Sequence, residues 1–273
     1  MTTRHYENFP VASWLLPASK RPHVAAVYAF ARSADDFSDE EKYRGRSLEL
    51  LNQWREWLKG SDGVPSHPIF LALADTIREC RLPVQLLDDL LTAFTMDVTK
   101  RRYATWEELL TYCRYSANPV GRLVLTIFGI EDPKLHRLSD AICTGLQLAN
   151  HWQDLAIDFG EKDRLYIPQD LMKKFGVAES DLARFLKTSQ GQTLEGLTPL
   201  MEELVVRAEA LFAEGEPLPE KVRGRLRLEL KLTLLGGREI LNQIQAAGYD
   251  PFRRRPVIST AKKLNLLAQA LFS

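Results

Sequence analysis

The chain has 273 residues and 45% of them are hydrophobic, which is enough apolar material for a large buried core. Lys plus Arg and Asp plus Glu number 36 each, so the chain has no formal net charge at pH 7. Because no field of one sign would attract polyanions, and no basic stripe carries interleaved aromatic residues, we expect no nucleic-acid partner.

The three cysteines, Cys80, Cys113 and Cys143, are widely separated and form neither a disulfide framework nor a zinc motif. The first residues, MTTRHYENFP, lack the apolar stretch of a signal peptide. No segment approaches the run of about 18 apolar residues that suggests a membrane span. The sequence therefore predicts a cytoplasmic protein with reduced thiols, and no feature of it requires an oligomer.

Apolar residues recur at spacings of three and four through most of the chain, which is the pattern of amphipathic helices. Clear windows are LELLNQWREWL, LLDDLLTAFTMDV, PLMEELVVRAEALF and KLNLLAQALF. Turn-forming residues gather at 60–68, 129–134, 187–199 and 214–220, but none of these segments has the length or polarity of a domain linker. The sequence predicts one all-α domain of residues 1–273 with roughly ten helices.

The segment YAFARSADDFSDE, residues 28–40, places carboxylates in a helix that otherwise has a buried pattern. At about 100° per residue, four polar side chains fall within an arc of roughly 60°: Tyr28, Arg32, Asp35 and Asp39. Apolar residues flank this arc on both sides. The segment therefore predicts a narrow acidic stripe on an apolar helix.

The segment QLANHWQDLAIDFGEKDRLYIP, residues 147–168, repeats the pattern. Drawn as one continuous helix, it places four polar side chains within an arc of roughly 80°: Gln147, Asn150, Asp154 and Asp158. One such pair of acids is common on a solvated helix face. Two pairs, both within apolar helices, are a stronger indication of a site.

Carboxylates four residues apart on one helix face repel each other, and burial raises their pKa values unless a counter-ion is present. Mg²⁺ removes this repulsion, since it prefers oxygen ligands and is commonly held by one or two carboxylates together with substrate phosphates. We therefore interpret Asp35, Asp39, Asp154 and Asp158 as Mg²⁺ ligands from two facing helices. The bound metal would in turn hold a diphosphate.

These segments resemble the two aspartate-rich motifs of the squalene/phytoene synthase family of isoprenoid synthases, including the RLYIP that follows the second. Between them, YATWEELLTYCRYSANPVGRLVL is similar to the family's Tyr-Cys segment and a glycine that follows it. Near the end, GYDPFRRRPVISTAKKLNLLAQAL is similar to its basic C-terminal helix. The resemblance runs in order from about Asn8 to Leu271.

The resemblance implies an all-α isoprenoid-synthase fold around a deep apolar cavity, with Mg²⁺ at the four aspartates and Arg32 on the departing diphosphate. It also implies a set of substrate-binding positions: Tyr28, Asp36, Tyr112, Ala117, Asn118, Gly121, Gln147, Asn150, Arg164 and Tyr166. Aromatic side chains would face the carbocation, and Phe30, Phe94, Trp152 and Tyr112 are the candidates.

Three features resemble one branch of the family, whose members ionise presqualene diphosphate and capture the cation with water to give hydroxysqualene. Gln153 stands where the family usually has arginine, SANPVG replaces a glycine-containing run, and the N-terminus reads HYENFPVASWLLP. No dinucleotide fingerprint follows a strand, so water capture fits better than hydride reduction. Tyr115, Ser116 and Asn118 are candidates to hold the water.

Two other functions remain open. The chain could be a head-to-head prenyltransferase that makes presqualene diphosphate, squalene or phytoene. It could also be a non-catalytic assembly factor of the same fold, although such a factor has no physical need for paired buried acids.

Several further residues have more than one interpretation. We expect His151, at the edge of the second stripe, to support or pack rather than react, and Cys113 to be a buried thiol. Residues 253–255, RRR, fit a diphosphate or lipid-headgroup contact and a solvated turn equally well. The last helix is amphipathic, which usually means core packing, and peripheral contact with a membrane surface is the alternative.

Overall fold

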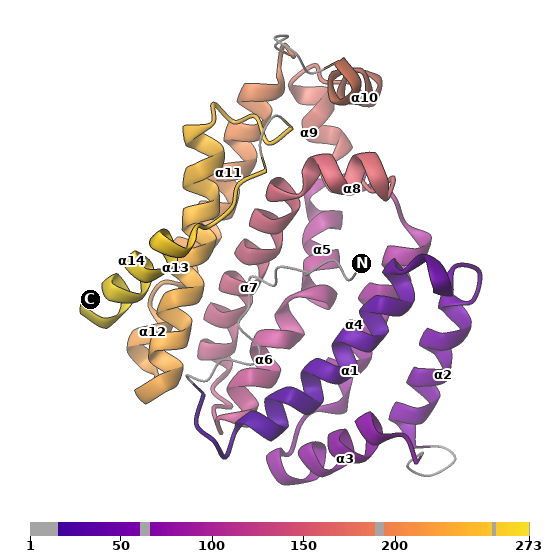
Figure 1. The fold of residues 1–273 in the computed structure, drawn as a ribbon, viewed down its shortest axis with the longest axis vertical. Helices are drawn as coiled ribbons and strands as arrows, with labels where there is room; N and C mark the ends of the chain where they lie inside the picture. The colour runs from indigo at the N-terminus through magenta and orange to yellow at the C-terminus, as the bar shows by residue number, and fades with distance from the viewer. Residues whose placement is uncertain (1–15, 61–65, 189–193, 253–254, 273) are drawn as a thin grey trace. The chain divides into compact units, whose positions relative to one another are not determined.

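The computed structural model describes residues 16–60, 66–188, 194–252 and 255–272 (Figure 1). Within these ranges the regular elements are fourteen α-helices and one 3-10 turn, and the only β-type pairing is a single parallel bridge between Arg102 and Leu165. The prediction of an all-α fold is confirmed. The expected number of helices was too small, because short helices and breaks at Ala117 and Asp154 divide segments that the apolar pattern joins.

The described residues fall into two compact units. The N-terminal unit comprises residues within 16–100 together with 112–143, and the C-terminal unit comprises 101–111 together with residues within 144–272. Two helices contribute residues to both units, α5 (Trp106–Ser116) and α7 (Pro133–Gln153). One domain of residues 1–273 with a deep central cavity stays a prediction.

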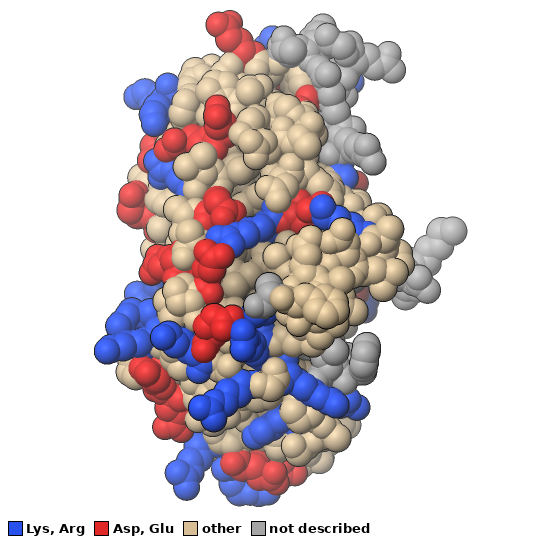
Figure 2. Space-filling view, turned by 90° about the vertical axis from the view of Figure 1, so that its left-hand side faces the viewer, with Lys and Arg blue, Asp and Glu red and all other residues tan. Residues whose placement is uncertain are grey.

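Charged side chains of both signs are interspersed on the face shown in Figure 2. None of the described helices combines the length and apolar character needed to cross a bilayer.

The N-terminal unit is built mainly from helices that pack on α1 and α4. Its elements besides parts of α5 and α7 are α1 (Arg21–Asp39), the 3-10 turn η1 (Glu41–Tyr43), α2 (Ser47–Lys59), α3 (Pro68–Cys80), α4 (Val84–Thr99) and α6 (Asn118–Ile127). A proline near the start of α1, α3 and α6 suits the first turn, where a helix has no use for its N–H group.

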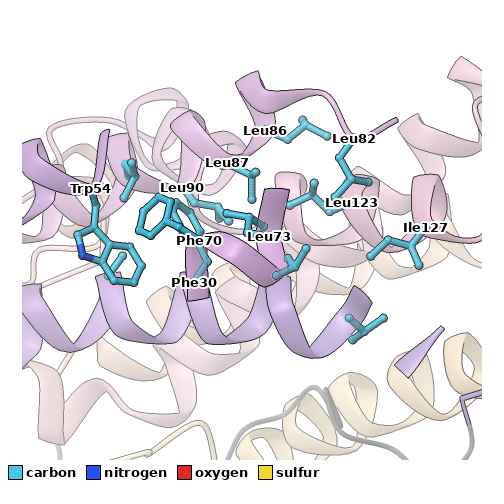
Figure 3. Packing of buried hydrophobic residues seen from close by; sticks show 14 of the residues in the cluster. Phe30, Trp54, Phe70, Leu73, Leu82, Leu86, Leu87, Leu90, Leu123 and Ile127 are labelled. Carbon is cyan, nitrogen blue, oxygen red and sulfur yellow. The ribbon is translucent and has the colours of Figure 1, made fainter. Parts of the chain in front are cut away.

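The core of the N-terminal unit is rich in aromatic rings (Figure 3). Phe30 of α1 lies with its ring centroid 5.2 Å from that of Trp54 and 5.8 Å from that of Phe70. Leu73, Leu87 and other leucines complete the cluster. Since buried aromatic side chains contribute large apolar areas, this cluster fixes the apolar face of α1 and leaves its polar stripe on the other side.

The C-terminal unit is built around α13, which packs against α11, α12 and α14. Its elements besides parts of α5 and α7 are α8 (Leu155–Glu161), α9 (Gln169–Lys174), α10 (Glu179–Thr188), α11 (Leu197–Gly215), α12 (Leu218–Lys221), α13 (Gly224–Ala246) and α14 (Thr260–Phe272). The fully buried ring of Phe212 lies against Gly145 and Gly237. A Cβ at Gly237 would come within 2.4 Å of this ring, so the close approach of α11 and α13 requires glycine there.

Candidate active site

The first aspartate motif, defined as Asp35 and Asp39, lies on an uninterrupted stretch of α1. Arg32 contacts Asp35 at 3.4 Å and Asp36 at 2.7 Å, so the motif carries its own counter-ion within one helical turn. The side chains of Asp35 and Asp36 are 35% and 27% exposed, and Asp39 is also half-buried. The acids are therefore accessible to a ligand without lying free in solvent.

The stripe predicted on α1 exists, and Phe30, a candidate to face the carbocation, lies on the opposite side of the helix from it. Tyr28 is half-buried and shares the polar side with Arg32. Phe30 is fully buried in the aromatic core, because two residues along a helix turn a side chain to nearly the opposite face. The expectation that Phe30 faces a carbocation is wrong. Phe94 packs on the same core and is partly buried.

The second aspartate motif, defined as Asp154 and Asp158, lies at a break between two helices rather than on one helix. The helix α7 ends at Gln153, α8 begins at Leu155, and Asp154 between them has φ −102° and ψ 11°. The backbone still bonds from Asp154 N to Asn150 O at 2.8 Å and from Asp158 N to Asp154 O at 2.8 Å. Helical spacing is thus kept along Asn150, Asp154 and Asp158, although the continuous helix was a wrong expectation.

The carboxylates of the second motif have basic neighbours from elsewhere in the chain and from the next turn. Arg255 bonds through Nε to Asp154, 101 residues away, and Lys162 Nζ lies 3.6 Å from Asp158. The side chains of Asp154 and Asp158 are 30% and 15% exposed. Of the basic run at 253–255, Arg255 thus contacts the motif directly, and Arg253 and Arg254 lie outside the described residues.

The loop after α8 is held in part by Arg102 and Glu179, which the sequence did not single out. Arg164 N bonds to Asp158 O at 2.8 Å, and Asp163 has a left-handed φ of 54°. Arg102 bonds to the Asp163 carboxylate at 2.6 Å and to both carboxylate oxygens of Glu179. These partners are 61 and 77 residues from Arg102, so no local pattern indicates them. The loop buries Arg164, a predicted diphosphate-facing residue, to 6% exposure.

Three aromatic side chains stack beside the second motif. The Tyr166 ring lies 3.6 Å from the His151 ring and 5.6 Å from the Tyr103 ring, measured between centroids, and both pairs are stacked. Burial lowers the pKa of His151 to about 3, and Lys162 and Arg164 add to the effect. A neutral, packed His151 agrees with the expected supporting role. Gln147 and Asn150, both half-buried, lie earlier on α7.

The segment around Tyr112 contains a buried polar contact that the sequence did not predict. The Tyr112 hydroxyl donates to Asp97 Oδ2 at 3.0 Å, and these residues are 3% and 6% exposed. Asp97 lies in the apolar window of α4, which also contains Asp88 and Asp89, and its spacing of three and four residues from Phe94 and Ala93 was the available signal. Cys113 is fully buried and burial raises the pKa of its thiol, so it is a packed thiol as expected.

The positions that follow Tyr112 lie at the junction of α5 and α6. Ala117 is buried between these helices, and Asn118, which begins α6, is half-buried. A Cβ at Gly121 would lie 2.3 Å from Ser139 Oγ and 2.6 Å from Cys143 Sγ. Close packing of α6 on α7 therefore explains this glycine. Contacts of Ala117, Asn118 and Gly121 with a substrate stay predictions.

The carboxylates of each motif are suitable oxygen ligands for Mg²⁺ if a substrate supplies the remaining ligands. Within the described ranges, no three His, Cys, Asp or Glu side chains form a group that could hold a metal ion by themselves. Mg²⁺ keeps several waters and usually takes one or two carboxylates plus phosphate oxygens, so a half-buried pair is a suitable partial donor set. The two motifs belong to different units, and their sharing of cations stays a prediction.

Known proteins of similar sequence identify the family of this chain. The family model for squalene/phytoene synthase matches residues 2–262. The hydroxysqualene synthase of Rhodopseudomonas palustris is 38% identical over 255 residues, or 93% of this chain and 84% of the relative. The hydroxysqualene synthase of Sinorhizobium fredii is 35% identical over 260 residues, or 94% and 85% of the two chains.

A solved structure gives the same result for the fold. The squalene synthase HpnC of Alicyclobacillus acidocaldarius superposes with a TM-score of 0.82 at 43% identity, covering 90% of this chain and 91% of that one. The helices therefore have the all-α arrangement of isoprenoid synthases. Because the family model spans nearly the whole sequence and includes both aspartate motifs, the chain belongs to the squalene/phytoene synthase family.

Proposed function

We propose that this chain is a hydroxysqualene synthase, which ionises presqualene diphosphate with Mg²⁺ and gives hydroxysqualene and diphosphate. Members of its family are diphosphate-processing isoprenoid enzymes. The observation that carries the proposal is the pair of half-buried aspartate motifs, each with a cationic side chain already in contact. Relatives named hydroxysqualene synthase that match more than nine-tenths of the chain support this branch.

The chain's own residues would bind and orient the diphosphate. Mg²⁺, when bound by the aspartates, supplies charge neutralisation on the departing group. Arg32 contacts Asp35 and Asp36, and the backbone N–H of Arg164 donates to Asp158 O. In this proposal the guanidinium groups of Arg32 and Arg164 donate to diphosphate oxygens. Ionisation breaks the C–O bond and both electrons leave with the diphosphate, so positioned positive charge lowers the barrier without a covalent nucleophile.

Water would then add to the rearranged cation and lose one proton. Ser116 is the best-supported candidate to hold this water, because its hydroxyl oxygen is buried and has no hydrogen-bond partner within the part of the chain that the structure describes. Tyr115 and Asn118 are half-buried neighbours in sequence. Tyr112, whose hydroxyl is fixed by Asp97, offers an immobile aromatic ring.

Product analysis tests the proposal directly. Purified enzyme with presqualene diphosphate and Mg²⁺, and without a nicotinamide cofactor, should release an alcohol whose oxygen comes from water, detected by mass analysis in H₂¹⁸O. Because one solved relative is named a squalene synthase, squalene is the main competing product to look for. Formation of squalene alone, and only with NADPH, would reject water capture. Condensation of two farnesyl or geranylgeranyl diphosphates would favour a head-to-head prenyltransferase instead.

We also propose that α14 makes peripheral contact with a membrane surface, where a water-insoluble product would leave. Its core side is formed by Leu266 and Ala270. On the other side Leu264, Leu271 and Phe272 are 64%, 59% and 91% exposed. Cosedimentation with anionic vesicles should fall when Leu264 and Leu271 are changed to Ser, and unchanged binding would exclude this surface.

A further inference from the structure

Residues 255–257 each make a contact with a side chain that lies between 14 and 103 residues away in the sequence. One contact is an ion pair, one is a hydrogen bond to a carbonyl, and one is a hydrogen bond from a backbone N–H. We call this set of contacts the clasp, and it consists of Arg255 Nε to Asp154 Oδ1, Gln153 Nε2 to Pro256 O at 2.7 Å, and Val257 N to Gln243 Oε1 at 3.0 Å.

The clasp restricts where the Arg255 side chain can go. The proline that follows Arg255 limits its backbone to extended conformations. Gln153 is only 2% exposed and Pro256 is buried, so their hydrogen bond is shielded from water and would leave a buried carbonyl unsatisfied if lost. Gln153, which binds Pro256, directly precedes Asp154, which pairs with the guanidinium of Arg255. The anchor of the segment and the acid are therefore adjacent in the sequence.

The Arg255–Asp154 ion pair occupies one of the two carboxylates assigned to the metal. Asp154 Oδ1 accepts from Nε, and the other N–H donors of Arg255 meet no acceptor within the described ranges. The lone pair of Oδ1 that accepts this bond is not available to a cation, and a cation bound elsewhere on the same carboxylate would be repelled by the adjacent guanidinium charge. The guanidinium and Mg²⁺ therefore compete for Asp154.

We propose that the clasp holds Arg255 on Asp154 as a resident counter-ion that a divalent cation must displace, with Gln153 as the positioning residue. This rests on the proposed function, since it takes Asp154 as a metal ligand. Arg255 keeps the half-buried acid neutralised before the metal arrives. Binding of metal at the second motif is then coupled to release of the guanidinium.

The test measures Mn²⁺ binding to the free enzyme, by calorimetry and by the loss of the free-ion signal in electron paramagnetic resonance. Mn²⁺ replaces Mg²⁺ because it can be observed directly, and no substrate is present. The variants are Arg255→Gln, which removes the competing cation, and Gln153→Met, which keeps the side-chain size but removes the donor to Pro256. Arg238→Gln is the matched control, since Arg238 is a similarly half-buried arginine paired with Glu209 and Glu216.

The Arg255→Gln variant should bind Mn²⁺ about two- to fivefold more tightly than the unmodified enzyme, which is the range expected for loss of one partly exposed ion pair. Gln153→Met should shift affinity in the same direction by a smaller factor. The double variant should match Arg255→Gln alone, because Gln153 acts through Arg255. Arg238→Gln should leave the affinity unchanged.

Unchanged, weaker or undetectable Mn²⁺ binding in a folded Arg255→Gln variant overturns the competition. An effect of Gln153→Met that persists in the Arg255→Gln background overturns its role as positioning residue. The Asp154→Asn variant distinguishes a failure of the proposed metal site from a failure of the clasp. If this variant keeps both Mn²⁺ binding and diphosphate release, the proposed function itself fails; if it loses them while Arg255→Gln has no effect, only the clasp fails.

Discussion

The two aspartate motifs contain the same acids at the same spacing, but the chain builds them differently. The first lies on unbroken helix α1, and its counter-ion Arg32 is three and four residues from the acids it contacts. The second lies at the break between α7 and α8, and its counter-ion Arg255 is 101 residues away. A motif on one helix forms with that helix, whereas the second requires tertiary contacts before its acids are in place.

The largest expected effect is on catalysis. Changing Asp35 to Asn or Asp154 to Asn should reduce diphosphate release by about a hundredfold or more, because each removes charge that stabilises the metal on the leaving group. Glu41→Gln and Glu161→Gln are controls, since both acids are exposed and lie just outside the motifs. Full activity in either Asn variant would remove that motif from the site.

We expect acid to lower the stability of the fold through His151, a buried histidine beside the second motif, whereas among the described residues the first motif has no such group. His151 is 5% exposed, and burial lowers its pKa from 6.5 to about 3. Because the folded-state pKa lies below the unfolded value, the unfolded state binds a proton more readily. The contribution of His151 to stability is therefore complete above about pH 6.5 and is lost as the pH falls toward 3. Between pH 7 and pH 5 the loss from this group is about 2 kcal/mol.

His151→Phe keeps a ring on Tyr166 but cannot titrate. Its free energy of unfolding, measured in urea at pH 7 and pH 5, should therefore fall less on acidification than that of the unmodified enzyme. An equal fall in both proteins would show that His151 does not carry the acid sensitivity.

Loss of Arg102 should disturb the second motif alone. Arg102→Gln removes the bonds to Asp163 and Glu179 that hold the loop after α8, and we expect a stability loss of about 1–2 kcal/mol with a reduced rate of diphosphate release. Arg55→Gln is the matched control in the N-terminal unit, because Arg55 is equally exposed, at 22%, and pairs with Asp88. It should lose stability but keep its activity per folded molecule. Equal activity losses in both variants would contradict a specific role of Arg102.

The smallest effect should come from the local counter-ion. Arg32→Lys keeps the charge on α1 but loses the planar guanidinium that reaches both Asp35 and Asp36. Stability should change by less than about 1 kcal/mol, as for other partly exposed ion pairs, while the KM for the diphosphate substrate rises. A large drop in melting temperature would mean that the first motif depends on Arg32 for folding.

The difference between the motifs also explains how much could be predicted. Apolar spacing predicted the helices, and angular position predicted the stripe on α1, because both depend on neighbours within two turns. The continuous helix through Asp154 was wrong, although the backbone bonds from Asn150 to Asp158 keep its spacing. The contacts of Gln153 with Pro256 and of Asp97 with Tyr112 could not be predicted, since no periodic pattern links residues 103 or 15 positions apart.

We propose that both motifs act on one metal–diphosphate complex. The sharpest test is a double-mutant cycle on the rate of diphosphate release from presqualene diphosphate. If Asp35 and Asp154 act as a unit, the double variant Asp35→Asn/Asp154→Asn should be about as slow as the slower single variant. If the two losses multiply, the motifs contribute independently and the account of a shared complex is contradicted.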